Sequence, residues 1–290
     1  MRILLIGSEG QLARDLAIAL SQHELVSRSH RELEIRDALA VQQVVNEVAP
    51  ACIINTAAYH RVDECEDRPE LAFAVNAVGA YNFARAAQEH GVKLVHFSTD
   101  FVFDGKKRTP YTEADRPNPL SVYGMSKWAG ERLIERYCEK HYVIRTSGLY
   151  GTGGSASKGG NFVRSILRAA EHGKPLHVVN DQTITPTSTA DLAEKVAQLL
   201  EHESYGIYHM TNTGECSWFD FAKEVLRLAG VSAEITPVTS EEYGAKAQRP
   251  AYSVLDNTRM RALGVEEFGP WQSALAEFIK EEQPRLRSAA

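Results

Sequence analysis

Short apolar runs alternate with amphipathic segments through the first half of the chain. Uninterrupted apolar runs of this length, bounded by turn residues, predict buried strands. The predicted strands are residues 2–7, 23–29, 51–58, 92–100 and 142–147. Between them, apolar residues recur every three or four positions, which predicts amphipathic helices. The predicted helices are residues 11–21, 37–50, 69–91 and 118–138.

This alternation predicts the fold class. Strands that are apolar on both faces are typical of a parallel sheet covered by helices on both sides. We therefore expect an α/β fold with a Rossmann-type doubly wound parallel sheet over residues 1–150. After residue 150 strands and helices no longer alternate regularly. We expect residues 151–290 to form mainly a smaller C-terminal lobe, with segments that return to the sheet. Its predicted elements are helices at 188–202, 217–230 and 270–282 and strands at 205–211 and 233–238.

A loop rich in Gly and Ser, residues 151–161, separates the two parts. Such a loop is either a surface connection or a flap that orders over a ligand. The sequence leaves both interpretations open.

Composition and charge exclude several classes of protein. The chain has 290 residues, 43% hydrophobic and 24% charged, which is ordinary for a globular protein. A net charge of −6 argues against nucleic acid as a partner, and no apolar run approaches the ~20 residues that a membrane span needs. The four cysteines are scattered without a C-x-x-C motif, so we expect free thiols, no metal site and a cytoplasmic location.

The turn after the first strand predicts a dinucleotide site. Gly7 and Gly10 lie between the first strand and the first helix, with Ala13 in the next slot of the pattern. Glycine allows a tight turn and close approach of backbone N–H groups to a phosphate, and the helix N-terminus favours negative charge. At the first strand of an alternating α/β chain, this G-x-x-G-x-x-A pattern indicates binding of a dinucleotide.

The end of the second strand indicates which dinucleotide binds. An acidic residue there usually contacts the ribose 2′-hydroxyl of NAD. Here the stretch contains Ser27, Arg28, Ser29 and Arg31, which would receive a 2′-phosphate through charge-assisted contacts. We therefore expect NADPH, with NADH as the alternative cofactor; the other interpretation is a solvated loop face.

Hydroxyl and amino groups predict the chemistry at a later strand. Ser98, Thr99 and Asp100 end the strand at 92–100, and ligands bind at that edge of open α/β sheets. Tyr123 and Lys127 are four positions apart, so one face of a helix carries both. A nearby ammonium favours the phenolate, and we expect Lys127 to lower the pKa of Tyr123. Hydroxyls of Thr and Tyr could together hold a carbonyl oxygen while Tyr donates a proton.

The set and order of these motifs resemble the extended short-chain dehydrogenases/reductases, and most closely the family of dTDP-4-dehydrorhamnose reductases. The resemblance covers nearly the whole chain. The motifs that carry it are GSEGQLA, NTAAYHRVDECE, AFAVNAVGAYNFA, STDFVFDG, YTEADRPNPLSVYGMSKWAGE, RTSGLYG, NFV, DQTITPTSTADLA and RPAYSVLD. It implies that residues 1–150 bind NAD(P) and that residues 151–290 mainly bind the substrate.

The resemblance also implies roles for individual residues. The catalytic residues would be Thr99, Tyr123 and Lys127. The cofactor would contact Gly7, Gly10, Gln11, Leu12, Arg28, Ala57, Ala58 and Tyr59, together with Tyr123 and Lys127. The substrate would contact Thr99, Asp100, Asn161, Phe162, Gln182 and Arg249. Asn76 would support the site or be a satisfied buried amide, and Arg249 would hold a diphosphate or form a surface ion pair.

Two positions depart from the family pattern. Gly148 stands where the family usually has Trp after Arg-Thr-Ser, and Ile184 and Thr185 stand where a Gly is common before Pro186. The first removes a flat wall beside the sugar, and the second alters a loop near the substrate. Both departures bear on which sugar is bound.

The resemblance implies NADPH-dependent reduction of the C4 ketone of dTDP-4-dehydrorhamnose, a nucleotide sugar, to dTDP-L-rhamnose, by a chain that could form a homodimer. One alternative is a reductase or epimerase of another nucleotide deoxysugar. Another is a non-catalytic, NADP-binding regulatory subunit of methionine adenosyltransferase.

Overall fold

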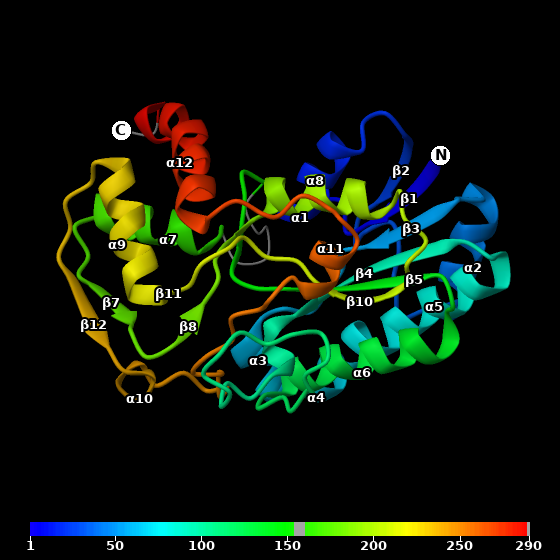
Figure 1. Cartoon of the computed structure of the whole chain (residues 1–290), viewed down its shortest axis with the longest axis horizontal. Helices are drawn as coiled ribbons and strands as arrows, with labels where there is room; N and C mark the ends of the chain where they lie inside the picture. Colours follow the sequence, from blue (N-terminus) through cyan, green and yellow to red (C-terminus); the bar gives the residue numbers. More distant parts are fainter. Residues whose placement is uncertain (154–159, 289–290) are drawn as a thin grey trace.

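A computed structural model describes residues 1–153 and 160–288, and the side chains through Glu282. Its centre is a six-stranded sheet in the order β10-β5-β4-β3-β1-β2, with every neighbouring pair parallel (Figure 1). The strands are β1 Arg2–Ile6, β2 Glu24–Arg28, β3 Cys52–Asn55, β4 Lys93–Thr99, β5 His141–Thr146 and β10 Gly206–His209. The predicted doubly wound parallel sheet is confirmed.

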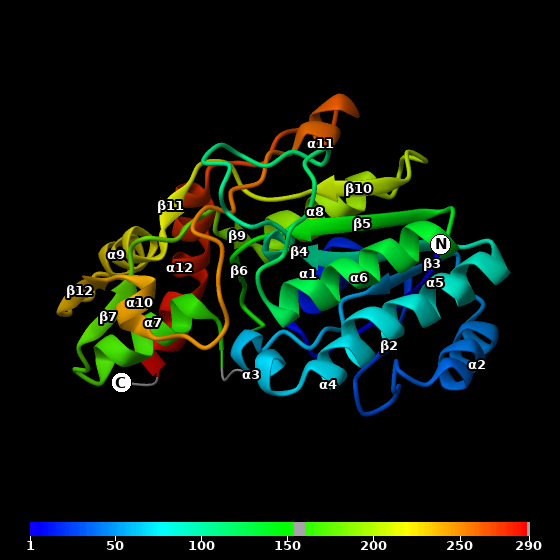
Figure 2. The same ribbon diagram turned by 90° about the horizontal axis from the view of Figure 1, so that it is seen from below.

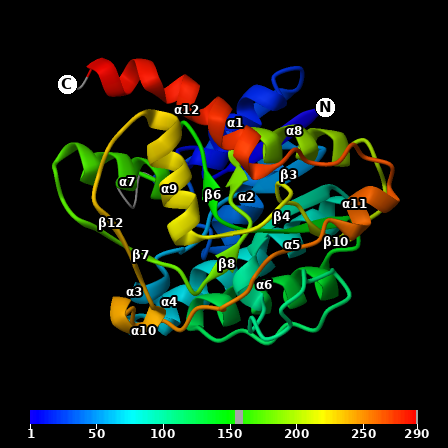
Figure 3. The same cartoon turned by 60° about the vertical axis from the view of Figure 1, so that its left-hand side comes forward.

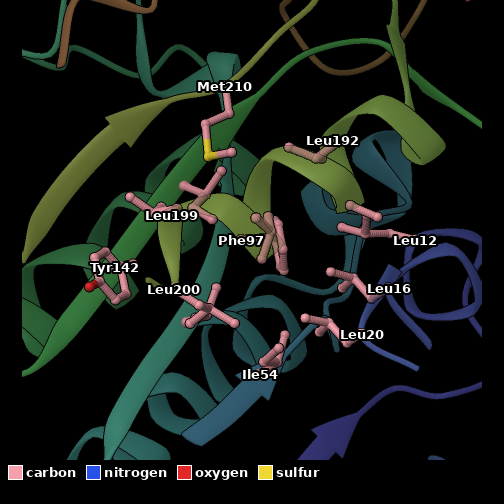
Figure 4. Packing of buried hydrophobic residues seen from close by; sticks show 14 of the residues in the cluster. Leu12, Leu16, Leu20, Ile54, Phe97, Tyr142, Leu192, Leu199, Leu200 and Met210 are labelled. Atoms are coloured by element: carbon pink, nitrogen blue, oxygen red, sulfur yellow. The ribbon is translucent and has the colours of Figure 1, made fainter. Parts of the chain in front are cut away.

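Helices cover both faces of the sheet (Figure 2). One face packs against α1 Gln11–Ala19 and α8 Thr189–Leu199, and the other against α2 Ala38–Val48, α5 Gly79–His90 and α6 Val122–Tyr137. Figure 4 shows how leucines of α1 and α8 meet strand residues in the first of these cores. Leu16 of α1 and Leu192 of α8 are fully buried there, and burial of each stabilises the fold by about 1.5–3 kcal/mol.

The helix predicted at residues 69–91 is one helical run with a distortion in its middle. It consists of α4 Pro69–Phe73, a π-helical turn η1 Ala74–Val78, and α5. A π-turn widens the helix and often lies near a functional site. Asn76 lies in this turn and is 1% exposed.

The start of α6 differs from the sequence prediction. The helix begins at Val122, where Ser121 accepts a hydrogen bond from the Gly124 N–H at 3.2 Å. Residues 118–120, which were predicted as helix, are not helical, because Ser121 caps the first turn and ends the preceding chain segment. This cap fixes the position of Tyr123 in the first turn of α6.

The second half of the chain builds a smaller helical layer and also returns to the sheet (Figures 1 and 3). Its core joins α7 Phe162–Glu171, α9 Trp218–Ala229 and α12 Trp271–Ser288 to the parallel pair β7 Leu176–Val179 and β12 Ile235–Val238. The sequence prediction missed α7 and β7, while β10 is the segment that returns to the sheet. No helix in residues 1–153 or 160–288 is long and apolar enough to cross a membrane.

Short elements connect these layers. Two small sheets pair β6 Leu149–Tyr150 with β9 Thr187–Ser188, and β8 Thr183–Ile184 with β11 Cys216–Ser217. The remaining short helices are α3 Val62–Asp67, η2 Asp100–Val102, α10 Ser240–Tyr243 and α11 Thr258–Ala262. Most of the loop predicted at 151–161 lies outside the described residues, so the choice between connection and flap stays open.

Candidate active site

The glycine turn forms a cradle between β1 and α1. Gly7 has φ +81°, and a Cβ added there would lie 2.7 Å from Thr56 Oγ1 and 3.0 Å from the Ala57 N atom. The N–H of Gly10 donates to the Gly7 carbonyl at 2.9 Å, which closes the turn directly before Gln11 begins α1. Only glycine fits this backbone, and the start of α1 favours an anion. The turn therefore fits the pyrophosphate of a dinucleotide.

Arg28 lies beside this turn. Its carbonyl accepts hydrogen bonds from the N–H groups of Gly7 and Ser8, at 2.9 and 3.3 Å. Its guanidinium reaches only the Ser27 carbonyl, at 3.0 Å, among the hydrogen bonds of the described residues. The sequence analysis missed Glu32, whose carboxylate accepts the Ser29 N–H at 2.7 Å in the same turn. The end of β2 therefore offers both a cation suited to a 2′-phosphate and a carboxylate suited to a ribose hydroxyl.

Three other predicted cofactor residues line the neighbouring strand ends. The Ala57 N–H donates to Asn55 Oδ1 at 3.0 Å, and the Tyr59 N–H donates to Asn76 Oδ1 at 2.8 Å. Ala58 lies between them, half-buried. Asn76 also donates to Ser126 Oγ at 2.9 Å, so it ties the loop after β3 to α6. Asn76 is therefore a buried amide with its hydrogen bonds satisfied, and through these bonds it also supports the loop after β3.

Gln11 and Leu12 occupy the first turn of α1 in different ways. Gln11 Nε2 donates to the Leu149 carbonyl at 3.2 Å, which links the glycine turn to the start of the second half of the chain. The Leu12 side chain is buried in the core under α1. Leu12 can therefore contact a pyrophosphate only through its backbone.

Thr99 and Tyr123 meet at the carboxyl edge of the sheet. Thr99 ends β4, and its hydroxyl donates to Asp100 Oδ1 at 3.1 Å and lies close enough to the Tyr123 hydroxyl to affect the pKa of Tyr123. The Tyr123 ring packs edge-on against Phe101 at a centroid distance of 5.7 Å. The structure therefore brings together two hydroxyls that the sequence places 24 positions apart, because β4 and the first turn of α6 meet at this edge.

The pKa of Tyr123 corrects one sequence prediction. Burial raises this pKa, the neighbouring Thr99 hydroxyl opposes the rise, and the Asp100 carboxylate adds to it. Lys127 is not among the groups that shift it, so the expectation that Lys127 lowers the pKa of Tyr123 is wrong for this structure. The reason is geometric, since the Lys127 ammonium donates to the Phe97 carbonyl at 2.6 Å instead. Tyr123 therefore stays protonated at neutral pH and can donate its proton.

Lys127 lies in the interior, one turn after Tyr123 on α6. Its side chain is 2% exposed, and its Nζ lies 3.3 Å from His96 Nε2. Burial lowers the pKa of Lys127 to about 8, and the Glu131 carboxylate opposes this shift. Lys127 can therefore change its charge near neutral pH.

Asp100 is a buried carboxylate that three hydroxyls hold. Besides Thr99, it accepts hydrogen bonds from Ser147 at 2.9 Å and from Ser253 at 2.5 Å. Burial raises the pKa of Asp100 to about 6 despite these bonds. The sequence analysis did not assign Ser147 or Ser253, although both lie in motifs it singled out. Asp100 thus links its own segment, after β4, to the segments that carry Ser147 and Ser253.

We expect Asp100 to make the stability of the protein depend on pH. The pKa of Asp100 in the folded protein is about 6, above the usual carboxyl value, so the folded state binds this proton more tightly than the unfolded state does. The protein is therefore more stable at low pH, and this extra stability is lost as the pH rises through about 6. The contribution is about 3 kcal/mol between pH 4 and pH 7. Urea unfolding of wild type and Asp100→Asn should show this fall in the wild type alone.

Asp104→Asn serves as the matched control. The Asn118 hydrogen bond lowers the pKa of Asp104, so its contribution has the opposite sign and is lost as the pH falls. Parallel stability profiles for wild type and Asp100→Asn would contradict the assignment.

The predicted substrate residues divide into two groups. Asn161 caps α7, donates to the Gly151 carbonyl at 2.9 Å and lies 3.4 Å from Gln11 Oε1, which places it beside the glycine turn. Phe162 follows it and packs on the Trp218 ring at 4.6 Å. The structure therefore brings Asn161, but not Phe162, into contact with a predicted cofactor residue.

Gln182 and Arg249 have partners away from Thr99. Gln182 Nε2 donates to Ser240 Oγ at 2.8 Å, and Arg249 pairs with Asp63 of α3 at 2.9 Å. The ion-pair alternative for Arg249 is therefore what the structure contains. Its role toward a diphosphate stays a prediction.

The two departures from the family pattern lie against each other. Gly148 has φ +56°, and an added Cβ would lie 3.1 Å from Ile184 Cδ1 and 3.1 Å from Pro186 Cα. Thr185 holds this segment by donating to the Gly214 carbonyl at 2.8 Å. A larger residue at position 148 requires both a different backbone angle and movement of residues 184–186. The surface at Gly148 therefore consists of backbone atoms of Thr185 and Pro186 and of the aliphatic side chain of Ile184.

Fold and site together define an extended short-chain dehydrogenase/reductase: a parallel sheet with a dinucleotide turn after β1, and Thr, Tyr and Lys at the edge of β4 and α6. The chain belongs to the family whose model is described as RmlD substrate binding domain, which matches residues 1–283.

Named relatives agree with this assignment over nearly full length. The dTDP-4-dehydrorhamnose reductase of Streptomyces griseus is 40% identical and covers 95% of this chain and 92% of its own. SpsK, a spore coat polysaccharide biosynthesis protein of Bacillus subtilis, is 40% identical over 97% of both chains. The crystal structure of dTDP-4-dehydrorhamnose reductase from Bacillus anthracis in complex with NADP has a TM-score of 0.93 and 38% identity. That match covers 97% of this chain and 99% of the other.

Proposed function

We propose that this protein reduces the C4 ketone of dTDP-4-dehydrorhamnose to dTDP-L-rhamnose with NADPH. The observation that carries the proposal is the neighbouring pair of hydroxyls of Thr99 and Tyr123, which lies at the carboxyl edge of a sheet whose first turn has a backbone that only glycine fits. Relatives that carry the name of this activity cover nearly the whole chain.

The described residues fit NADPH. Only glycine fits the backbone of the Gly7 turn, because an added Cβ would lie 2.7 Å from Thr56 Oγ1, and the turn is hydrogen-bonded to the backbone of Arg28. NADPH supplies a hydride when it is bound. Gly7, Gly10, Gln11 and the backbone of Leu12 would hold its pyrophosphate, and Ala57, Ala58 and Tyr59 would form the wall after β3.

The residues of this chain would complete the reduction at the ketone oxygen. The Tyr123 hydroxyl would donate to this oxygen and stabilise the negative charge that develops on it, and the Thr99 hydroxyl would join it by turning its proton from Asp100 to the ketone oxygen. Tyr123, protonated because burial raises its pKa, then donates its proton to the alkoxide. Lys127 would bind a hydroxyl of the nicotinamide ribose, and Asp100 holds Thr99 in place by accepting its hydroxyl proton.

The test is NADPH oxidation, followed by absorbance, with dTDP-4-dehydrorhamnose as substrate and product analysis to identify dTDP-L-rhamnose. No oxidation with this substrate would overturn the proposal.

A second candidate is the reductase of another nucleotide-linked deoxysugar. It is favoured by the wall at Gly148, where an added Cβ would lie 3.1 Å from Ile184 Cδ1 and 3.1 Å from Pro186 Cα, so that a larger side chain requires its neighbours to move. A panel of nucleotide 4-ketosugars with different configurations in the same assay separates the two candidates by kcat/KM. The substrate role of residues 151–290, a homodimer and a cytoplasmic location stay predictions.

Cofactor preference gives a further prediction. Arg28→Ala should raise the KM for NADPH by about 10- to 100-fold, because it removes a charge-assisted contact to the 2′-phosphate. The KM for NADH should change little. Steady-state titration of both cofactors measures the effect.

Arg36→Ala is the matched control, since Arg36 is occupied by its ion pair with Glu34. Equal changes for NADPH and NADH in Arg28→Ala would reject the 2′-phosphate assignment.

A further inference from the structure

A buried histidine lies directly behind Lys127. His96 of β4 is 1% exposed, and its two ring nitrogens face two different side chains. Nε2 lies 3.3 Å from Lys127 Nζ, and Nδ1 lies 3.1 Å from Asn55 Nδ2 of the neighbouring strand β3. The register of the sheet pairs Asn55 with His96, which fixes this contact.

The orientation of the Asn55 amide is determined by the backbone. The Ala57 N–H can only donate, and it donates to Asn55 Oδ1 at 3.0 Å. The NH₂ group of Asn55 therefore faces His96 Nδ1, and an NH₂ group can only donate. Nδ1 must accept this hydrogen bond, so the proton of the neutral imidazole lies on Nε2. The Nε2–H group then points at Lys127.

We propose that Asn55 and His96 are positioning residues that present an N–H donor, and not a lone pair, to Lys127 Nζ and thereby favour its neutral amine form. A neutral amine can accept from Nε2–H while it donates to the Phe97 carbonyl. An ammonium has no lone pair, so its N–H groups would face the Nε2–H donor of His96 at 3.3 Å without forming a hydrogen bond. The loop after β3, through the Ala57 N–H, thus influences the charge of Lys127.

The charges around this contact agree with the inference. Burial lowers the pKa of His96 well below its usual value, so the imidazole is neutral. Glu131 of α6 favours the ammonium of Lys127, but its carboxylate is already paired with Arg145 of β5 at 2.7 Å and hydrogen-bonded by Ser98 of β4. From β3, the group that faces His96 is the neutral amide of Asn55.

The first test is direct observation of the His96 tautomer. In ¹⁵N-histidine NMR of the full chain, His96 should show a protonated Nε2 and an unprotonated Nδ1. Its signals are identified by their loss in His96→Phe. A protonated Nδ1 in the wild type would overturn the inference, and this measurement needs neither substrate nor cofactor.

The second test reverses the tautomer. Asn55→Asp keeps the size of the side chain and the acceptor for the Ala57 N–H, but its other oxygen accepts from His96 Nδ1–H. Nε2 then offers a lone pair to the Lys127 ammonium. The NMR signals should exchange their protonation states, and the alkaline limb of the kcat/KM profile should move to higher pH by about one unit or more.

The double variant Asn55→Asp/His96→Phe controls for the added charge. It keeps the carboxylate but removes the imidazole, so the shift should be lost. A shift of equal size in the double variant would overturn the role of His96. The pH profile rests on the proposed function, whereas the NMR result stands without it, so the failure of one is distinguishable from the failure of the other.

Discussion

Replacing Tyr123 by Phe is expected to lower kcat by about 10²–10⁴-fold, the range for removing a general acid. The variant keeps the ring that packs on Phe101, so the fold and the shape of the site should be retained. It loses the hydroxyl that lies beside Thr99 and that would donate a proton to the ketone oxygen. KM should change less than kcat, because the hydroxyl acts mainly when negative charge develops in the transition state.

Tyr137→Phe is the matched control for this variant. Tyr137 ends the same helix and is 39% exposed, with its ring packed edge-on against Tyr81. Steady-state turnover with NADPH in excess should be unchanged in Tyr137→Phe. Turnover of Tyr123→Phe within a few-fold of the wild type would remove Tyr123 from the mechanism and leave a protein that only binds the dinucleotide.

The second large effect is expected on stability, from the ion pair under the site. Arg145 of β5 donates to both carboxylate oxygens of Glu131, at 3.0 and 2.7 Å, and both side chains are almost completely buried. Arg145→Met should lower the free energy of unfolding by about 3–5 kcal/mol, because it leaves the Glu131 carboxylate buried without its partner. Urea or thermal unfolding at pH 7 measures this loss.

The exposed pair of Arg85 and Glu89 on α5 gives the comparison. Both side chains are about half exposed, and Arg85→Met should lower the free energy of unfolding far less than Arg145→Met, because water screens an exposed ion pair. The double variant Glu131→Gln/Arg145→Met should be more stable than Arg145→Met alone, because no charge is then left buried. If Arg145→Met and Arg85→Met lowered the free energy of unfolding equally, burial would not be the reason that the pair of Arg145 and Glu131 matters.

The sequence analysis predicted most of the sheet but missed part of the second half. The strands β1, β3, β4 and β5 each contain a cluster of apolar residues, and every residue of β3 and β5 is buried. By contrast, α7 follows directly on a Gly-rich loop, and β7 is only four residues long. Signals of that kind are weak, since a short strand looks like any apolar stretch.

The candidate site was predicted unevenly for a similar reason. The glycine turn and the Tyr-x-x-x-Lys spacing are local signals. The structure shows a tight turn at Gly7 and brings the hydroxyls of Thr99 and Tyr123 together. The direction of the Tyr123 pKa was predicted wrongly, because burial decides it and Lys127 donates its hydrogen bond elsewhere. Ser253, which holds Asp100 from 153 positions away, carries no local signal at all.

By itself, the sequence determined the alternation of strands and helices, the turn that suits a pyrophosphate and the residue types available for the chemistry. These follow from periodicity and from the preferences of single residues, which act between near neighbours in the chain. Only the tertiary structure decided which of these groups meet and what charge they carry. The burial of Asp100, the direction in which Lys127 points and the partner of His96 all depend on strand register and helix packing. Electrostatics and hydrogen bonding act through distance in space and through exclusion of water, and neither is written in the spacing of residues along the chain.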